Sequence, residues 1–504
     1  MSGKRYLMGL DIGSSGCKVT LLDIDKNQVT SLSEEIKTYY PDPGWAEQEP
    51  REWLDKLSSM IKKITKNKKT ISESIAAVGL SGVTHSLIMM DKDNNILGRT
   101  IHITDGRSFD QSRNLEEKAG DMILEKALNP VDVMWTISML AWVREKDRER
   151  WDRISKILFP KDYIRHMLTG SIATDTIDAQ GTLLYDPIGK KWDGELADLI
   201  GLDISVLPET FEPCTLAGKI SSKGALWSGL KQGTPVLTGS TDTVMEVFSA
   251  GSKDEGDCTV KLATFGRICI ITSRPYYGKG LINYSYIIPG KWYPGTGTKS
   301  CGTSFRWCRD QFFSELKKDK AYEFMTHKAG KIPPGSQGLI FHPYLQGEGS
   351  PYDDPRLRGD LIGLTLHHNR DHIARSVLEG TCFSLLDSMN FIKEKNIEIK
   401  PPLRFIGGGT RSSLWTQILA DILGYDAVIP KNTDPSIGAA LAAGVGVGIF
   451  GDLSQAQEFN RGISREILFD DDRNLRYMEI FDLYKDTQSR LVDINHKLAE
   501  KYDA

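Results

Sequence analysis

Two glycine-containing hairpin openings constrain the fold of this chain most. The first, GLDIGSSGCKVTLLD, covers residues 9–23, and the second, VKLATFGRICIITS, covers residues 260–273. In each, apolar and β-branched stretches flank a short turn, which predicts two strands joined by a turn and not a strand that leads into a helix. Such a turn exposes backbone N–H groups and hydroxyls, which suit phosphate oxygens. The repetition predicts two related domains that bind one phosphate chain.

The length of the chain also favours two domains. At 504 residues it exceeds what one hydrophobic core usually serves, and its 40% apolar and 26% charged residues are ordinary for a globular protein. We expect an N-terminal domain over residues 1–250 and a C-terminal domain over residues 251–504.

Charge and composition argue against several classes of protein. A formal net charge of −4 gives no basic excess for nucleic acid or an anionic membrane. The longest apolar stretch, 437–450, contains glycines and is shorter than the roughly 20 residues that span a bilayer. Seven scattered cysteines without a CxxC pair predict reduced thiols, and the nine histidines show no zinc-binding spacing. With no signal peptide visible, we expect a cytoplasmic protein.

Strand and helix patterns alternate along the chain, which makes α/β the predicted fold class. We expect strands at 76–80, 86–90, 96–99 and 403–406, and an irregular region from 273 to 340. Helices are expected at 50–64, within 108–169, and at 371–393, 414–423, 436–447 and 478–502.

Two aspartates stand where chemistry is expected. Asp242 lies in the segment GSTDTVMEV, directly before a predicted helix. There it is either a general base for an alcohol acceptor or the N-cap of the helix, and the residues alone leave both roles open. Asp11 opens the first turn and is either a ligand for nucleotide-bound magnesium or a simple turn residue.

Several segments together resemble the FGGY family of carbohydrate kinases, within the actin-like ATPase superfamily. They are GWAEQEP (44–50), TDGRS (104–108), PKDYIRHMLTGSIATDTIDAQGT (160–182), GGGTRSSLWTQILADILGYDAVIP (407–430) and IGAALAAGVGVG (437–448). Their order and spacing extend the resemblance from about residue 6 to about residue 485, and within the family the chain is most similar to xylulokinases. The resemblance implies two actin-like (ribonuclease H-like) domains around a central cleft.

The resemblance also implies a nucleotide site for ATP and Mg²⁺. Asp11 matches the magnesium-binding aspartate. The positions that match phosphate-binding turns are Ser14, Ser15, Lys18, Thr264 and Gly266, and those that match the adenosine-binding segments are Gly302, Arg306, Gly408, Gly409 and Ser413. For Lys18 a solvated charge is the alternative, and for the adenosine-binding positions ordinary strand-to-helix packing.

A small-molecule sugar or polyol is the implied acceptor. The matching positions are Thr84, His85, Asp105 and Arg107, with Asp242 as the catalytic base. The alternatives are an interior histidine at His85 and a structural ion pair between Asp105 and Arg107. The resemblance makes D-xylulose or a similar pentulose the first choice, with another polyol, a hexulose or gluconate as alternatives. A homodimer is common among relatives, but nothing in these residues demands one.

Among the departures of the chain from the family pattern, four bear on its activity. Ala263 replaces a glycine of the second phosphate turn, beside Phe265, and alanine would be costly there if its φ were positive. Met139 occupies a common lysine position, and Gly349 a frequent arginine position. These departures motivate a second hypothesis, a catalytically weak sugar- or nucleotide-binding regulator on the same fold. The joint presence of Asp11, Thr264 and Asp242 argues against it.

Overall fold

The computed structural model describes residues 5–66 and 69–502 and divides into two compact units. Unit 1 comprises Met1–Lys253, Asn283–Trp292 and Asn432–Arg461, and unit 2 comprises Asp254–Ile282, Tyr293–Lys431 and Gly462–Ala504. The expected boundary at residue 250 lies close to the end of the first segment. The segments 283–292 and 432–461, which the sequence placed in the C-terminal domain, belong to unit 1.

Unit 1 is built on a sheet whose first hairpin is the first glycine-containing opening. The strands in spatial order are β14 (Leu216–Lys219), β15 (Pro235–Leu237), β6 (Ile75–Gly82), β1 (Tyr6–Ile12), β2 (Gly16–Asp23) and β3 (Gln28–Glu35), with β16 (Ser240–Thr241) also paired to β6. Strands β1 to β3 are antiparallel, whereas β6 runs parallel to β1 and β15 runs parallel to β6. All of β6 and nearly all of β1 are buried, as expected for strands covered on both faces.

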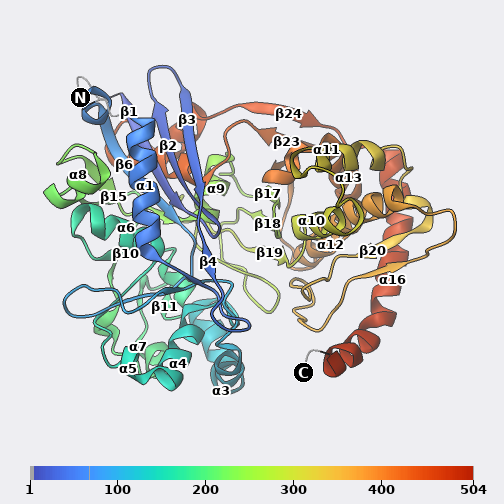
Figure 1. Cartoon of the computed structure of the whole chain (residues 1–504), viewed down its shortest axis with the longest axis horizontal. Coiled ribbons are helices and arrows are strands. Elements are labelled where there is room, and N and C mark those ends of the chain that lie inside the picture. Colours follow the sequence, from blue (N-terminus) through green and yellow to red (C-terminus); the bar gives the residue numbers. More distant parts are fainter. Residues whose placement is uncertain (1–4, 67–68, 503–504) are drawn as a thin grey trace. The chain divides into compact units, whose positions relative to one another are not determined.

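Two helices cover opposite faces of this sheet. Helix α1 (Pro50–Ile64) lies along β2 and β3 (Figure 1) and buries Trp53 and Leu57 in a core with Leu10. Helix α14 (Pro435–Gly446) covers the other face, because side chains alternate along a strand and the neighbouring Gly9 faces it. A Cβ atom on Gly9 would lie only 1.7 Å from the Ser436 carbonyl oxygen, so glycine is what lets α14 approach the strands.

The remaining elements of unit 1 surround this sheet or form small sheets. The helices are α2 (Lys69–Glu73), α3 (Phe109–Ala127), α4 (Thr136–Lys146), α5 (Arg148–Trp151), α6 (Pro160–Thr169), α7 (Gly194–Asp198), α8 (Ser222–Ser228), α9 (Asp242–Ser249) and α15 (Leu453–Phe459), with 3₁₀ turns η1 (Ala179–Thr182) and η2 (Ile204–Val206). The short strands are β4 (Thr38–Tyr39), β5 (Glu47–Gln48), β7 (Ile88–Met90), β8 (Thr100–Ile101), β9 (Lys156–Leu158), β10 (Ala173–Asp175), β11 (Tyr185–Asp186), β12 (Lys191–Trp192) and β13 (Glu209–Phe211).

Unit 2 repeats the sheet plan. Its strands in spatial order are β19 (Gly295–Thr298), β18 (Gly266–Ile270), β17 (Asp257–Leu262), β22 (Lys400–Ile406), β23 (Ala427–Pro430) and β24 (Ile463–Ile467). Again three antiparallel strands are followed by two parallel ones, and β17 holds the place that β1 holds in unit 1. The expected α/β fold with a repeated domain plan is confirmed.

Besides its sheet, unit 2 contains several helices. They are α10 (Gly302–Phe312), α11 (Lys318–Ala329), α12 (Arg370–Glu394), α13 (Ser413–Leu423) and α16 (Asp471–Tyr502), with 3₁₀ turns η3 (Ser336–Gly338) and η4 (Gly408–Arg411) and the hairpin of β20 (Ile340–His342) and β21 (Asp360–Ile362). Helix α12 is buried along most of its length and packs beside α13.

Two predictions of secondary structure were wrong. The expected strand at 96–99 is absent from the described residues, where only an isolated bridge joins Met90 to Ile96, and β7 pairs with β9 instead. The region from 273 to 340, expected to be irregular, contains α10 and α11. There the buried Ser304, Phe305 and Cys308 carry the packing face, so aliphatic periodicity gives little signal.

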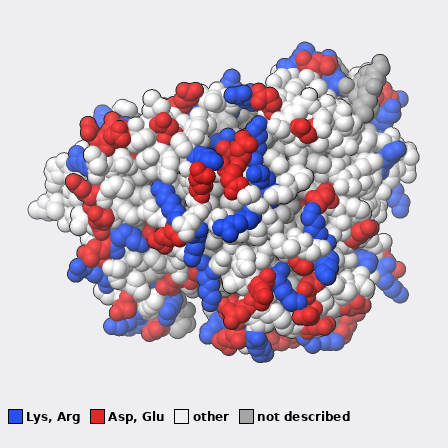
Figure 2. Space-filling model, turned by 180° about the vertical axis from the view of Figure 1, so that it is seen from behind, with Lys and Arg blue, Asp and Glu red and all other residues white. Residues whose placement is uncertain are grey.

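The surface and the cysteines agree with the composition. On the face that Figure 2 draws, acidic and basic side chains are interspersed. All seven cysteines lie within the described ranges and carry free thiols. Among those residues, no helix has both the length and the hydropathy that a bilayer crossing requires.

Candidate functional site

Asp11 lies at the end of β1, on the face of the sheet that α14 covers. Its register partners are Lys18 on β2 and Ser81 on β6. The aspartate is 7% exposed, and its Oδ1 atom has no hydrogen-bond partner among the described residues. A buried carboxylate oxygen that lacks a partner is suited to a hard cation.

Asp242 reaches the same end of the sheet from the other side. Ser240 on β16 pairs with Ser81 on β6, which in turn pairs with Asp11, so two strand spacings, about 10 Å, separate the backbones of Asp11 and Ser240. Asp242 is the first residue of α9 and is only partly buried. The alternative role of Asp242 as the N-cap was wrong, since Thr241 is the N-cap and accepts from the Val244 N–H.

A third aspartate, Asp434, lies near Asp11, and the sequence analysis did not identify it as a site residue. It is the N-cap of α14, and its carboxylate forms an ion pair with Lys18. Burial, together with the charges of Asp434 and Asp242, raises the pKa of Asp11 well above its usual range, although Ser81 and Lys18 lower it. The site therefore concentrates negative charge around one lysine, which favours a bound cation.

Ser14 and Ser15 form the exposed tip of the β1–β2 hairpin. The turn closes with a hydrogen bond from the Gly13 N–H to the Gly16 carbonyl, and the side chain of Gln48 donates to the Ser14 carbonyl. Both hydroxyls are therefore accessible on a turn that the backbone holds in place.

In unit 2, the β17–β18 turn docks on the start of α10. Gly302 donates its N–H to the Ala263 carbonyl at 2.7 Å, and the Thr264 hydroxyl accepts from Arg306 at 3.4 Å. A Cβ atom on Gly302 would lie 2.6 Å from the Ala263 oxygen, so this contact requires glycine. Thr264 and Arg306 are exposed, whereas Gly266 is buried and donates its N–H to the Thr298 hydroxyl. The structure thus brings Thr264, Gly302 and Arg306 together.

The GGGT segment follows β22 and lies beside the same turn. Gly409 packs against Leu262, the last residue of β17, whereas a Cβ atom on Gly408 would meet open space. Ser413 is exposed at the start of α13, where Ser412 is the N-cap.

Thr84 and His85 lie in the loop after β6. The Thr84 hydroxyl donates to Asp178 at 2.8 Å. His85 has a left-handed φ of 66° and is 2% exposed, and its ring nitrogens hydrogen-bond to Tyr284 and to the Met134 carbonyl. These partners match the alternative of an interior histidine.

Asp105 and Arg107 form a buried ion pair. The Arg107 guanidinium donates to both oxygens of Asp105 at 2.8 Å, reaches Glu47 at 2.8 Å, and lies over Trp45. Asp105 also accepts from the Ala46 N–H at 2.5 Å, so both its oxygens are engaged. The pair holds the 103–107 loop against residues 45–47, in agreement with the structural alternative.

Comparison with known proteins decides the family. Residues 6–249 match the family model described as "FGGY family of carbohydrate kinases, N-terminal domain", and residues 271–447 match its C-terminal counterpart. A xylulose kinase of Lactococcus lactis subsp. lactis (strain IL1403) is 30% identical over 502 residues, which cover 99% of each chain. The chain belongs to the FGGY family of carbohydrate kinases. The predicted family is therefore confirmed, and the protein is a sugar kinase that uses ATP as its phosphoryl donor.

Solved structures agree with this assignment. The ligand-bound xylulose kinase from Lactobacillus acidophilus superposes with a TM-score of 0.89 at 26% identity, covering 98% of this kinase and 99% of that chain. The gluconate kinase from Lactobacillus acidophilus gives a TM-score of 0.88 at 27% identity, with 96% and 98% covered. The two-domain, actin-like fold of the kinase is confirmed by these superpositions.

The structure accounts for three of the four departures that bear on activity. The φ of Ala263 lies outside the positive region, so its Cβ is not strained. A Cβ atom on Gly349 would lie 2.4 Å from the Gly297 carbonyl oxygen, which excludes an arginine there. Met139 is fully buried in α4, where an uncharged side chain packs. Phe265 is 47% exposed, and no contact explains it.

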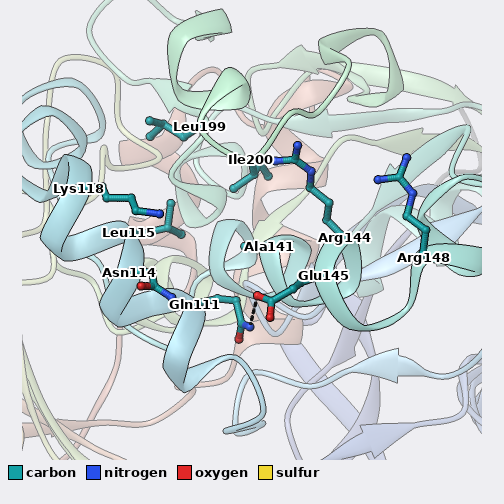
Figure 3. A pocket seen from close by; sticks show the side chains of 10 residues that line it. All are labelled: Gln111, Asn114, Leu115, Lys118, Ala141, Arg144, Glu145, Arg148, Leu199 and Ile200. Atoms are coloured by element: carbon teal, nitrogen blue, oxygen red, sulfur yellow. Dashed lines mark hydrogen bonds between the residues drawn. The ribbon is translucent and has the colours of Figure 1, made fainter.

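A separate hollow of about 300 Å³ lies between α3 and α4 (Figure 3) and shares no residue with the site. Lys118 and Arg144 line it, and the Gln111 side chain there donates to Glu145. We assign it no function, because its cationic side chains are exposed.

Proposed function

We propose that this kinase transfers the γ-phosphoryl group of ATP to a terminal hydroxyl of a ketose, D-xylulose or a similar pentulose. The observation that carries the proposal is the strand register: Asp11 and Ser240 pair with Ser81 from opposite sides, and Asp242 follows two residues after Ser240. The charge of Asp242 acts on the Asp11 carboxylate, so the two acids lie near each other, an arrangement that suits a metal-bound nucleotide and an acceptor hydroxyl. The named activities of the xylulose kinase relatives support the pentulose.

Asp242 is the proposed catalytic base. Its carboxylate is partly exposed at the start of α9 and accepts a hydrogen bond from the Thr243 hydroxyl at 3.2 Å. In the proposed reaction, Asp242 orients the sugar hydroxyl and takes its proton, and the sugar oxygen attacks the γ-phosphorus in line as the bond to the bridging oxygen breaks and ADP leaves. Phosphoryl transfer needs little covalent help, so orientation and charge neutralisation supply most of the rate.

Each unit carries positions that are proposed to bind ATP. In unit 1, Asp11 would hold Mg²⁺, whose charge neutralises the phosphates when it is bound, and Ser14, Ser15 and Lys18 would bind phosphate oxygens. In unit 2, Thr264 and Gly266 would bind phosphate, and the adenosine would lie against Gly302, Arg306, Gly408, Gly409 and Ser413. The open space over Gly408 and the exposure of Thr264 and Arg306 support these assignments.

Thr84, His85, Asp105 and Arg107 are proposed to shape the sugar pocket. Because the polar atoms of His85 and Asp105 already have protein partners, Asp105 and Arg107 would act by fixing the 103–107 loop. A hexulose, another polyol or gluconate stays an alternative substrate, and the similar gluconate kinase supports the last. Free thiols support a cytoplasmic location, and a homodimer is proposed from the resemblance alone.

The decisive experiment is Asp242→Asn in a coupled assay of ADP release, with pentuloses, hexuloses, polyols and aldonates as acceptors. We expect wild-type turnover to be highest on a pentulose. The variant should bind ATP normally and lose about 10²- to 10⁴-fold in kcat, the range that a general base contributes. Near-wild-type phosphorylation by the variant would exclude Asp242 as the base.

A further inference from the structure

A cluster of charged side chains lies fully buried in unit 1. It contains Lys161, Asp162 and Arg165 of α6, Asp175 at the end of β10 and Asp178 just before η1. Each of these side chains is 0% exposed. A buried group of charges is weak evidence for stability, because apolar side chains of similar volume stabilise a core at least as well. The cluster therefore calls for another explanation.

Lys161 is the centre of the cluster. Its ammonium lies 2.7 Å from Asp162, 2.9 Å from Asp175 and 3.0 Å from Asp178. Arg165 braces Asp162 from the next turn of α6 at 3.0 Å and donates to the Thr238 carbonyl. Although burial lowers the pKa of Lys161, the carboxylates outweigh that effect and raise it above its ordinary value, so the lysine stays charged.

The cluster lies directly behind the strand end that carries the proposed site. A Cβ atom on Gly82, the last residue of β6, would lie 3.1 Å from the Lys161 backbone nitrogen. Gly82 pairs with Ile12 on one side and with Thr241, the N-cap of α9, on the other. Lys161 thus packs against the strand that separates Asp11 from Asp242.

One hydrogen bond leads from the cluster to the proposed base. The Ser240 hydroxyl donates to Asp175 at 2.8 Å, and both side chains are fully buried. Ser240 forms β16 with Thr241, and Asp242 follows at once. Asp175 is fixed in turn by Lys161 and by the Ile177 N–H at 3.0 Å.

A second hydrogen bond leads to the loop of His85. The Thr84 hydroxyl donates to Asp178 at 2.8 Å, just before the left-handed backbone of His85. That conformation is unfavourable for a non-glycine residue, so the loop needs neighbours that hold it. Thr136 supplies a further bond, from its hydroxyl to the His85 carbonyl at 3.0 Å.

We propose that Lys161 is a positioning residue for phosphoryl transfer, which acts through Asp175 and Ser240 on the base Asp242, and through Asp178 and Thr84 on the sugar-binding loop. The inference rests on the proposed function, because it takes Asp242 as the base. One buried ammonium holds both loops in a fixed relation, which is the relation that an in-line transfer from nucleotide to sugar requires.

The two branches make different kinetic predictions. Ser240→Ala removes only the bond that orients the start of α9, so kcat should fall about 10- to 100-fold while KM for sugar and ATP stays within about twofold. The matched control is Ser228→Ala, which removes another fully buried hydroxyl of unit 1, one that donates to the Gly224 carbonyl. It should lower Tm similarly and leave kcat unchanged. Wild-type kcat in Ser240→Ala would overturn the first branch.

Thr84→Val tests the second branch. Its KM should rise by a common factor of about 5 to 10 for every accepted sugar and deoxy-sugar, with kcat little changed, because a misplaced loop affects all acceptors alike. Thr84→Ser keeps the donor and should restore KM. An increase confined to sugars with one particular hydroxyl would show direct contact and overturn the positioning role of Thr84.

Lys161→Met leaves three buried carboxylates without their cation, so this variant is informative only if it folds. The proposal is therefore tested with the Ser240 and Thr84 variants. Asp242→Asn in the same assay separates the two levels of inference. If Asp242→Asn stays active, the proposed function fails. If Asp242→Asn is inactive but Ser240→Ala and Thr84→Val behave as wild type, only the positioning network is refuted.

Discussion

Lys18 and Asp434 form an ion pair although 416 positions separate them in the sequence. Lys18 lies on β2 beside Asp11, and Asp434 caps α14, whose first turn packs on the same strands through Gly9. The pair neutralises in advance a lysine that we propose for phosphate binding. Asp434 therefore competes with the nucleotide for Lys18.

Asp434→Asn should accordingly tighten ATP binding. Asparagine keeps an oxygen to cap Ser436 but releases Lys18, and it removes a charge that raises the pKa of Asp11. The lysine side chain is 33% exposed, so solvent partly screens the ion pair and its interaction free energy is about 1 kcal/mol. Releasing Lys18 from this pair should therefore lower the Kd for ATP by up to about fivefold. Isothermal titration with ATP and Mg²⁺ measures it. Asp452→Asn, which changes the N-cap of α15 in the same unit, is the control, and weaker ATP binding by Asp434→Asn would contradict competition.

Gly9→Ala should severely destabilise unit 1. The added Cβ would lie 1.7 Å from the Ser436 carbonyl, and that atom belongs to a helix backbone that cannot turn aside. We expect the free energy of unfolding to fall by more than about 3 kcal/mol, which exceeds the usual cost of overpacking, or the protein not to fold at all. Gly194→Ala, whose new Cβ would have no atom within 4 Å, should unfold at the wild-type temperature in a thermal melt. Equal melts of the two variants would refute the close approach of α14.

Glu348 should make the stability of unit 2 depend on pH. Burial raises its pKa to about 7, although the N–H groups of Lys299 and Gly349 and the Ser384 hydroxyl lower it. Because the folded pKa lies above the ordinary value of 4.5, the contribution of this group is complete below pH 4.5 and is lost as the pH rises to 7.

Glu348→Gln removes this titration and keeps the acceptor oxygen. The difference in the free energy of unfolding between wild type and variant should therefore fall by up to about 1.4 kcal/mol per pH unit between pH 5 and 7. Urea unfolding at a series of pH values measures it. Parallel pH profiles of the two proteins would show that Glu348 does not titrate in this range.

The two sides of the β17–β18 turn should tolerate mutation differently. Ala263→Gly should leave KM for ATP within about twofold and cost about 0.5–1 kcal/mol of stability, because Ala263 has no strained φ and glycine is more flexible when unfolded. Gly302→Ala should raise KM for ATP at least several-fold, since its Cβ would displace the turn at the Ala263 oxygen. Steady-state kinetics with varied ATP compares them, and a large change in Ala263→Gly would mean that the turn adjusts when the nucleotide binds.

Elements with strong local signals could be predicted from the sequence. Helix α1 begins at Pro50, as expected, and its apolar spacing continues to Ile64. The Asp242 loop and the start of α9 were also expected. The N-cap is Thr241 and not Asp242, and the sequence does not distinguish them because adjacent serine, threonine and aspartate residues are all favourable N-caps.

Long-range charge pairing could not be predicted. The sequence TDPS is typical of a helix N-cap at Asp434. No local sequence pattern, however, indicates that α14 packs on β1 and that Asp434 therefore meets Lys18. Lys161, Asp175 and Asp178 lie in a segment that resembles the family, but charged residues in a row normally indicate an exposed face. Only the fold shows that they are buried together.

The position of α14 in the chain has a consequence for synthesis. Residues 1–253 leave the ribosome long before the helix that closes over Gly9 and Gly79 has been translated. One face of the central strands of unit 1 therefore stays uncovered while most of unit 2 is translated. Nascent kinase is thus exposed to chaperones and to aggregation during this interval, and a polypeptide that stops at residue 253 has no way to complete its own core.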